Sequence, residues 1–210
     1  MYSPKFNALT DKNEALDFIR QFSFGTLITS KDNIPEATHL PFLVELRNDE
    51  IVLTSHFAKA NEQWKDIEEN QALVIFSEPH AYISPNNYEK EQNVPTWNYI
   101  SVHLYGKGKL ITDYKSVIEL LEKSIDTYEA AYKDQWNSLP DDYKRKMANG
   151  IVAFEIEVND LQAKKKLSQN RTDKEQKNII NSLSRSRVSN EKLIADYMLK
   201  EQELKTGSSK

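Results

Sequence analysis

Cysteine is absent from this chain of 210 residues, and no long apolar run is present. Without cysteine there is no disulfide, no thiolate nucleophile and no cysteine-ligated zinc or iron–sulfur centre. A glycine-rich loop is also lacking, which excludes nucleotide binding of the Walker and Rossmann types. Because no stretch reaches membrane-spanning length and no signal peptide is visible, we expect a cytoplasmic protein without a membrane partner.

Positive charge is concentrated at the end of the chain. Residues 163–210 contain 12 Lys and Arg against 6 Asp and Glu, whereas residues 1–162 contain 16 against 26. We therefore expect one domain over residues 1–162 and a basic helical segment over residues 163–210. Such a segment suits contact with nucleic acid, phosphate or an acidic partner, although a solvated pair of charged helices explains it equally well.

Hydrophobic periodicity predicts short strands joined by turns, with helices inserted among them. Strands are expected over residues 24–30, 38–46, 50–57, 72–77, 96–112 and 150–158. Helices are expected over residues 11–21, 59–68, 114–132, 141–148, 174–184 and 190–204. Because strands and helices do not alternate regularly, the expected fold is mainly β with added helices, an antiparallel barrel.

The strand expected over residues 96–112 has two unlike faces. One face is apolar, whereas the other carries aromatic and hydroxyl side chains with one histidine: Trp97, Tyr99, Ser101, His103 and Tyr105. This second face is neither core nor ordinary surface, and it suits a ligand-lined groove or a subunit interface.

The four histidines all lie in the first half of the chain: His39, His56, His80 and His103. No two of them are spaced as i and i+4 on a helix or as His-x-His on a strand, so no metal site is expected. Histidines hydrogen-bonded at a groove or an interface are the favoured interpretation. No nucleophile elbow occurs either, and we assign no catalytic residue.

Two segments are candidates for anion binding. The strand end at Thr54 and Ser55 runs towards Lys59, where a helix should open, and hydroxyls, backbone N–H groups and an ammonium make a phosphate cradle. An ordinary helix cap with an exposed lysine explains these residues equally well. The second candidate is the run Lys164 to Arg171, with its planar amides and guanidinium; its alternative is a solvated linker.

Several longer motifs together resemble a known family. They are Ala37-Thr-His-Leu-Pro-Phe, His56-Phe-Ala-Lys-Ala-Asn-Glu-Gln-Trp, Pro79-His-Ala-Tyr-Ile-Ser-Pro, Val94-Pro-Thr-Trp-Asn-Tyr, Val102-His-Leu-Tyr-Gly and Lys166-Leu-Ser-Gln-Asn-Arg. In this order they resemble the PaiB-type FMN-binding negative transcriptional regulators of bacteria, and the similarity runs from Met1 to about residue 183.

The resemblance implies a split β-barrel related to flavin reductases and pyridoxamine-phosphate oxidases. It also implies a homodimer with FMN at the subunit interface, and repression of sporulation and degradative-enzyme genes. The cofactor-binding residues expected from the resemblance and the motifs are Thr38, His39, Thr54, Ser55, Lys59, Ala60, Trp97, Asn98, His103, Gln169 and Arg171. Thr38 and His39 would lie beside the isoalloxazine ring.

Contact with promoter DNA is expected from the family and from the basic segment. The residues assigned to it are Lys164, Lys165, Lys166, Arg185 and Arg187. No strong helix-turn-helix motif supports this assignment. Two alternatives stay open: a flavin-dependent reductase that uses the same pocket, and a haem-binding split barrel with a histidine as axial ligand. The lack of a nicotinamide site disfavours a self-contained reductase.

Overall fold

The computed structural model describes residues 1–207, which form two compact units. The barrel unit comprises Leu16–Phe76 and His103–Leu161. The helical unit comprises Met1–Ala15, Ser77–Val102 and Gln162–Lys210, of which residues 208–210 lie outside the described part. The segment expected as a basic appendage therefore belongs to a unit that also includes two earlier stretches of the chain.

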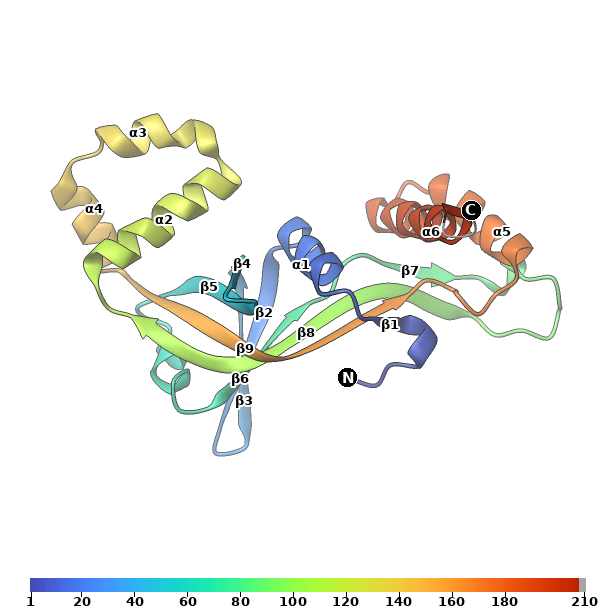
Figure 1. Ribbon diagram of the computed structural model, residues 1–210, viewed down its shortest axis with the longest axis horizontal. Coiled ribbons are helices and arrows are strands. Elements are labelled where there is room, and N and C mark those ends of the chain that lie inside the picture. The colour runs from blue at the N-terminus through green and yellow to red at the C-terminus, as the bar shows by residue number, and fades with distance from the viewer. Residues whose placement is uncertain (208–210) are drawn as a thin grey trace. The chain divides into compact units, whose positions relative to one another are not determined.

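The barrel unit is built on an antiparallel sheet (Figure 1). Its strands are β2 (Phe24–Lys31), β3 (Ile34–Pro41), β4 (Leu43–Arg47), β5 (Glu50–Ala58), β6 (Gln71–Phe76) and parts of β8 (Thr96–Ile111) and β9 (Ile151–Lys166). They are hydrogen-bonded in the order β3-β2-β6-β8-β9-β5-β4. The Ser55 hydroxyl of β5 donates to the Pro41 carbonyl of β3 at 2.6 Å, so the sheet curls until β5, the strand next to last in this order, meets β3, the first. The mainly β class with added helices is confirmed.

Two-residue turns join neighbouring strands where asparagine and aspartate tolerate left-handed backbone. Asp32 and Asn33 have φ values of 51° and 63°, and Asn48 and Asp49 have values of 52° and 67°. Such turns match the twist of paired strands. The single strand expected over residues 38–46 is wrong, because the chain bends at the buried Phe42 and forms β3 and β4 instead.

Phenylalanine rings fill the interior of the barrel unit. Phe57 stacks on Phe154 with 4.7 Å between ring centroids, and Phe42 meets the edges of Phe76 and Phe154 at 5.7 and 6.3 Å. All four rings are fully buried, and aromatic pairs of this kind stabilise a core beyond their buried area. Phe57, Phe76 and Phe154 lie on the inward face of their strands, and Phe42 reaches the same interior from the bend between β3 and β4.

Three helices connect β8 to β9 in the barrel unit: α2 (Tyr114–Tyr128), α3 (Lys133–Ser138) and α4 (Asp141–Ala148) (Figure 1). Val117 and Leu120 of α2 pack with Ala148 and with Ala153 of β9. The helix expected over residues 114–132 ends at Tyr128, and α3 was not expected. The helix expected over residues 59–68 is a shorter 3₁₀ turn, η2 (Glu62–Asp66), capped by Asn61.

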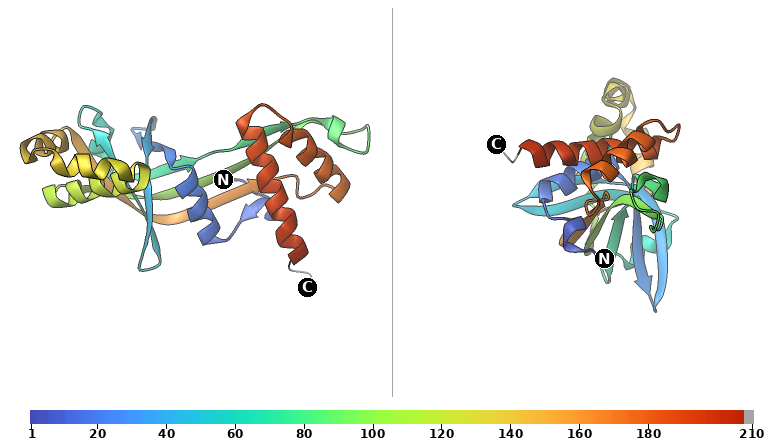
Figure 2. Two further views of the ribbon diagram at one scale, coloured as in Figure 1. Left: turned by 90° about the horizontal axis from the view of Figure 1, so that it is seen from above. Right: turned by 90° about the vertical axis from the view of Figure 1, so that its right-hand side faces the viewer.

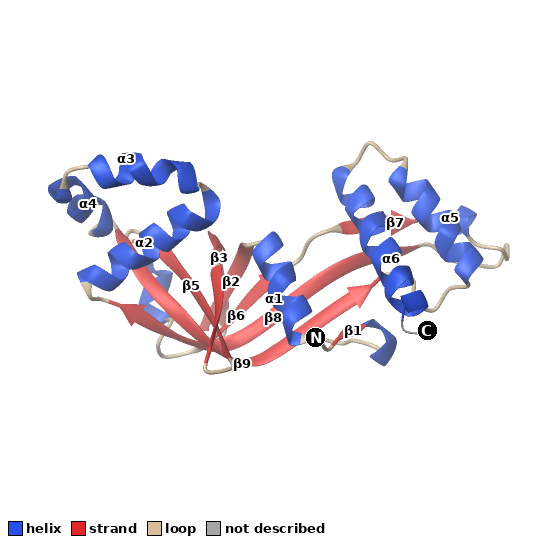
Figure 3. Ribbon diagram, turned by 45° about the horizontal axis from the view of Figure 1, so that its top comes forward, coloured by secondary structure: helices blue, strands red, loops and turns tan. Residues whose placement is uncertain are grey.

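The helical unit contains β1 (Ala8–Leu9), β7 (His80–Ile83), the start of β8 and the end of β9. Helices α5 (Asp173–Ser184) and α6 (Ser189–Gly207) lie side by side and confirm the two expected C-terminal helices (Figures 2 and 3). Helix α1 (Lys12–Gln21) begins in this unit and is capped by Asp11, whose carboxylate accepts the Asn13 N–H at 2.8 Å. None of the described helices is long and apolar enough to cross a membrane.

Strand β9 is longer than the expected 150–158, because it continues to Lys166. Its second half is polar and lysine-rich, a composition that is typical of a linker. Pairing with β1, in which Ala8 lies opposite Lys164, keeps this half extended. The residues that were expected as an anion site or a linker are therefore partly strand.

Candidate functional site

The expected phosphate cradle at Thr54 and Ser55 does not have the expected local structure. Strand β5 continues to Ala58, so both residues lie inside the strand, and η2 begins only at Glu62. Successive strand residues face opposite sides. The Ser55 hydroxyl is already donated to the Pro41 carbonyl, whereas Thr54 is buried on the other face. The two hydroxyls therefore do not converge on one ligand.

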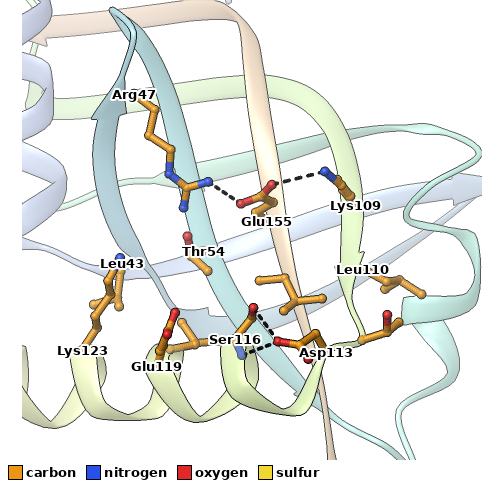
Figure 4. A pocket seen from close by; sticks show the side chains of 13 residues that line it. Leu43, Arg47, Thr54, Lys109, Leu110, Asp113, Ser116, Glu119, Lys123 and Glu155 are labelled. Atoms are coloured by element: carbon orange, nitrogen blue, oxygen red, sulfur yellow. Dashed lines mark hydrogen bonds and ion pairs between the residues drawn. The ribbon is translucent and has the colours of Figure 1, made fainter.

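Thr54 lines a pocket of about 410 Å³ between the sheet and α2 (Figure 4). Its hydroxyl has no hydrogen-bond partner among the described residues. The charged side chains around it balance, three cations against three anions: Arg47, Lys109 and Lys123, and Asp113, Glu119 and Glu155. We call this the mixed-charge pocket.

Each cation of the mixed-charge pocket has a carboxylate within ion-pair distance. Glu155 accepts a hydrogen bond from Arg47 at 2.5 Å and lies 4.0 Å from Lys109. Lys123 pairs at 2.7 Å with Glu45, and its hydrogen bond holds the pKa of that carboxyl below its ordinary value. An incoming phosphate would have to compete with these carboxylates.

Lys59 lines a second pocket of about 290 Å³, which shares Leu110 to Thr112 with the first. We call this the Lys59 pocket. Its lining is mainly apolar and aromatic and includes no acidic residue: Trp64, Tyr114, Val117, Ala148, Asn149, Ile151, Val152 and Ala153. Few polar groups in an apolar lining are typical of cofactor pockets.

The main chain of Lys59 is fixed, whereas its side chain is free. Its N–H donates to the Gly150 carbonyl at 2.9 Å, and its carbonyl accepts the Trp64 indole N–H at 3.2 Å. The Lys59 ammonium has no ion-pair or hydrogen-bond partner in the described part of the chain. A free ammonium beside an apolar pocket fits a planar ligand that carries a phosphate, so the residues of this pocket fit FMN. Ala60, which follows, is exposed in a turn.

Thr38 holds the turn after Lys59 in place. Its hydroxyl donates to the Gln63 side-chain oxygen at 2.6 Å and accepts from the Asn61 amide at 2.9 Å. Gln63 is fully buried and donates in turn to Thr29 at 3.0 Å and to the Glu36 carbonyl at 3.1 Å. Sequence reasoning missed Asn61 and Gln63. The available signal was Asn61 at a helix cap, where its carboxamide accepts the Gln63 N–H at 3.0 Å.

The histidines of the barrel unit occupy different environments. His39 is exposed and stacks on Phe24, with 6.3 Å between the ring centroids. His56 and His103 are half-buried, and burial lowers the pKa of each below its ordinary value. No group of three or more His, Asp or Glu side chains in the described residues could hold a metal ion.

Three of the cofactor residues expected in the helical unit form structural hydrogen bonds. Buried Asn98 accepts from the Ser168 hydroxyl at 3.0 Å, and Gln169 donates to the Lys165 carbonyl at 2.5 Å. Arg171 covers the Tyr88 ring at 3.8 Å and donates to Asn93 at 2.8 Å. These side chains therefore hold the loop and the strand ends together. Trp97, by contrast, is 51% exposed.

The five basic residues assigned to DNA also differ in their surroundings. Lys165 is buried and ion-paired with Glu14 and Glu201. Lys164 and Lys166 have no such partner among the residues that the structure describes, and Arg185 and Arg187 are exposed in the connection between α5 and α6. The basic run of the sequence is thus not one continuous basic surface.

Comparison with known proteins places these features in a family context. The family model described as "Putative FMN-binding domain" matches residues 1–160. The protease synthase and sporulation protein PAI 2 of Bacillus subtilis is 39% identical over 202 residues, covering 94% of this chain and 96% of the relative. An uncharacterized protein of Emericella nidulans is 27% identical over 232 residues, covering 89% and 92%.

Two solved structures share the fold at 15% sequence identity. The flavocytochrome Anf3 from Azotobacter vinelandii has a TM-score of 0.62, with 78% of this chain and 72% of that chain covered. The FAD and heme binding protein from Mycobacterium smegmatis has a TM-score of 0.61, with 76% and 73% covered. The likeness confirms the expected split β-barrel.

Proposed function

Because this chain belongs to the FMN-binding domain family, we propose that it binds FMN in its barrel unit and acts in the regulation of gene expression. The observation that carries the first part is the free Lys59 ammonium beside a pocket without acidic residues. A phosphate dianion gains most from a cation that no carboxylate already neutralises. In the mixed-charge pocket every lining cation has a carboxylate within 4.0 Å.

The residues of the Lys59 pocket have distinct tasks in this proposal. Lys59 binds the phosphate, and the aromatic side chains of Trp64 and Tyr114 exclude water from the pocket. Thr38 and Gln63 keep the turn that carries Lys59 in one conformation. FMN, when bound, supplies a redox-active isoalloxazine ring.

The regulatory part of the proposal is supported by the similarity to the sporulation protein of Bacillus subtilis. We assign to this chain the repression of sporulation and degradative-enzyme genes, in the cytoplasm and as a homodimer. Arg185 and Arg187 are both exposed in the α5–α6 connection and are available to promoter phosphates. Lys165 has no part in DNA contact, since two glutamates already neutralise it.

Titration of FMN by fluorescence quenching tests the cofactor site. Replacing Lys59 by alanine should weaken FMN binding by about 1–3 kcal/mol, the range for loss of a hydrogen bond to a charged group. Lys107→Ala is the matched control, because Lys107 is an exposed lysine of β8 that lies outside both pockets. Equal FMN affinity of the Lys59 variant and the parent would remove Lys59 from the site.

Salt-dependent binding to promoter fragments tests the regulatory part. Affinity for a duplex should fall with salt, at a slope of roughly −0.9 per phosphate contacted. Replacing both Arg185 and Arg187 by glutamine should flatten the slope by up to about two units. Absence of binding at low salt, with protein that is folded and dimeric in sedimentation, would end the direct-repressor version and leave the FMN site unaffected.

A further inference from the structure

One face of the sheet in the helical unit is covered, and the other is open. Strands β7 and β8 pair His80 with Tyr99 and Tyr82 with Trp97. These four side chains share the open face, whereas the residues that alternate with them are buried: Ala81, Ile83, Asn98 and Ile100. Asn98 lies 3.5 Å from the Met198 sulfur, which shows that α6 covers the buried face.

The open face displays aromatic rings. Trp97 is 51% exposed and Tyr82 is 46% exposed, and Tyr2 is almost fully exposed. The Trp97 ring lies 5.9 Å from both the Tyr82 ring and the His80 ring. An exposed aromatic cluster is unusual on a solvated surface and typically marks a binding surface.

Two lysines without counter-ions border these rings. Lys164 is only 7% exposed, and its ammonium lies 5.1 Å above the Tyr99 ring and donates to the Tyr2 carbonyl at 3.3 Å. Lys166 donates to the hydroxyl of Thr96, the residue at the start of β8 that precedes Trp97. Neither lysine has a carboxylate within ion-pair distance among the described residues. We call these lysines and the rings beside them the aromatic–lysine face.

Lys165, the residue between these two lysines, has the carboxylate partners that Lys164 and Lys166 lack in the described part of the chain. Lys165 points to the opposite side of β9, where Glu14 and Glu201 both pair with it. A buried cation is costly unless an anion compensates it. The helix side of the strand supplies that anion from within the chain, whereas the carboxylate beside the rings of the open face, that of Glu78, lies 4.0 Å from the His80 ring nitrogen and pairs with neither Lys164 nor Lys166. The charge of the open face is therefore complementary to an anionic ligand.

We propose that the aromatic–lysine face binds single-stranded nucleic acid. Unpaired bases stack on Trp97 and Tyr82, and the phosphates between them approach Lys166, while the almost fully buried Lys164 adds its positive charge from beside the Tyr99 ring. Stacking on exposed aromatic rings beside a basic groove is how proteins hold single strands without reading their sequence. A duplex keeps its bases stacked inside and offers no base faces to these rings.

A second copy of the chain fits this face less well. A two-fold contact uses the same patch on both subunits. It would bring two pairs of unneutralised lysines together, and like charges at an interface are unfavourable. Single-stranded nucleic acid, in contrast, supplies one anion and one aromatic face with each nucleotide.

Fluorescence anisotropy with a labelled oligothymidylate at low salt tests the proposal. Trp97→Ala should weaken binding about tenfold, since stacking of one base has about that worth. Tyr143→Ala is the control, because Tyr143 is equally exposed, at 48%, but lies in α4 of the barrel unit. Lys166→Gln, which leaves the rings in place, should reduce the salt slope by about 0.7.

Three results would overturn the proposal. One is an affinity for a duplex of the same length that equals the affinity for the single strand and that Trp97→Ala leaves unchanged. Another is conversion of a dimeric parent into a monomer by Trp97→Ala without any binding of the oligonucleotide, which would make the face a contact between copies. The third is loss of FMN affinity in the same variant, which would assign the face to the flavin. Loss of FMN binding in Lys59→Ala alone leaves this proposal standing.

Discussion

Lys165 of the helical unit and Lys59 of the barrel unit are both lysines that the sequence marks for anion binding, yet their surroundings are opposite. Lys165 is buried between Glu14 and Glu201. Burial lowers the pKa of Lys165, but the hydrogen bonds to the two glutamates outweigh it and raise that pKa above its ordinary value. Lys59 is exposed beside an apolar pocket and has no partner among the described residues.

The role of each lysine therefore depends on which carboxylates the fold brings near it. In the sequence, Lys165 stands in a run of three lysines, which favours an anion site, and Lys59 stands alone. The glutamates that neutralise Lys165 are distant in the chain. Their approach depends on the docking of α1 and α6, which a local pattern does not contain.

The largest loss of stability is expected when Lys165, which Glu14 and Glu201 neutralise, is replaced. Lys165→Met leaves two glutamates close together without their cation and should lower the free energy of unfolding by about 2–4 kcal/mol, somewhat less than for a fully buried pair. Urea denaturation measures it. The triple variant that also carries Glu14→Gln and Glu201→Gln should recover most of the loss. Lys59→Ala should stay within about 0.5 kcal/mol of the parent; a loss as large as that of Lys165→Met would contradict the comparison.

The half-buried imidazole of His56 should make the free energy of unfolding sensitive to acid. Because burial lowers the pKa of His56, the folded protein keeps this imidazole neutral, whereas the unfolded chain binds a proton below its ordinary pKa of 6.5. The stability that His56 contributes is therefore complete above that value and declines as the pH falls below it.

Urea denaturation at a series of pH values checks this prediction. The free energy of unfolding should decrease between about pH 7 and about pH 5.5, where few carboxylates titrate, and His56→Gln should reduce that decrease. The exposed His39, replaced in the same way, serves as the control. If the free energy of unfolding of His56→Gln decreased as much as that of the parent over this pH range, the burial of His56 would not be the cause of the acid response.

The smallest effect is expected at a surface pair. Lys133 lies 2.6 and 2.7 Å from the two carboxylate oxygens of Asp126, but both side chains are about half exposed, at 48% and 46%. Exposed pairs contribute little, so Lys133→Gln should change the free energy of unfolding by less than about 0.5 kcal/mol. A loss comparable to that of Lys165→Met would show that short distance, not burial, decides the strength of these pairs.

Local signals predicted much of the fold. The turns at Asp32–Asn33 and Asn48–Asp49 and the long strand β8 follow from residue types within a few positions. The second half of β9 was missed because its extended form depends on pairing with β1. The site divides in the same way. The local sequence predicts Lys59, because this residue follows a strand end. Gln63 supports the turn only because β2 and β3 bring Thr29 and the Glu36 carbonyl within hydrogen-bond distance of its side chain.

The proposed cofactor site depends on recognition of the FMN phosphate by the free ammonium of Lys59. The most direct measurement is the affinity of the parent and of Lys59→Ala for FMN and for riboflavin, which lacks the phosphate, in one buffer at one salt concentration. The parent should prefer FMN by about 1–3 kcal/mol, and the variant should lose this preference while its affinity for riboflavin stays the same. A preference for FMN that persists unchanged in the Lys59 variant would contradict the claim.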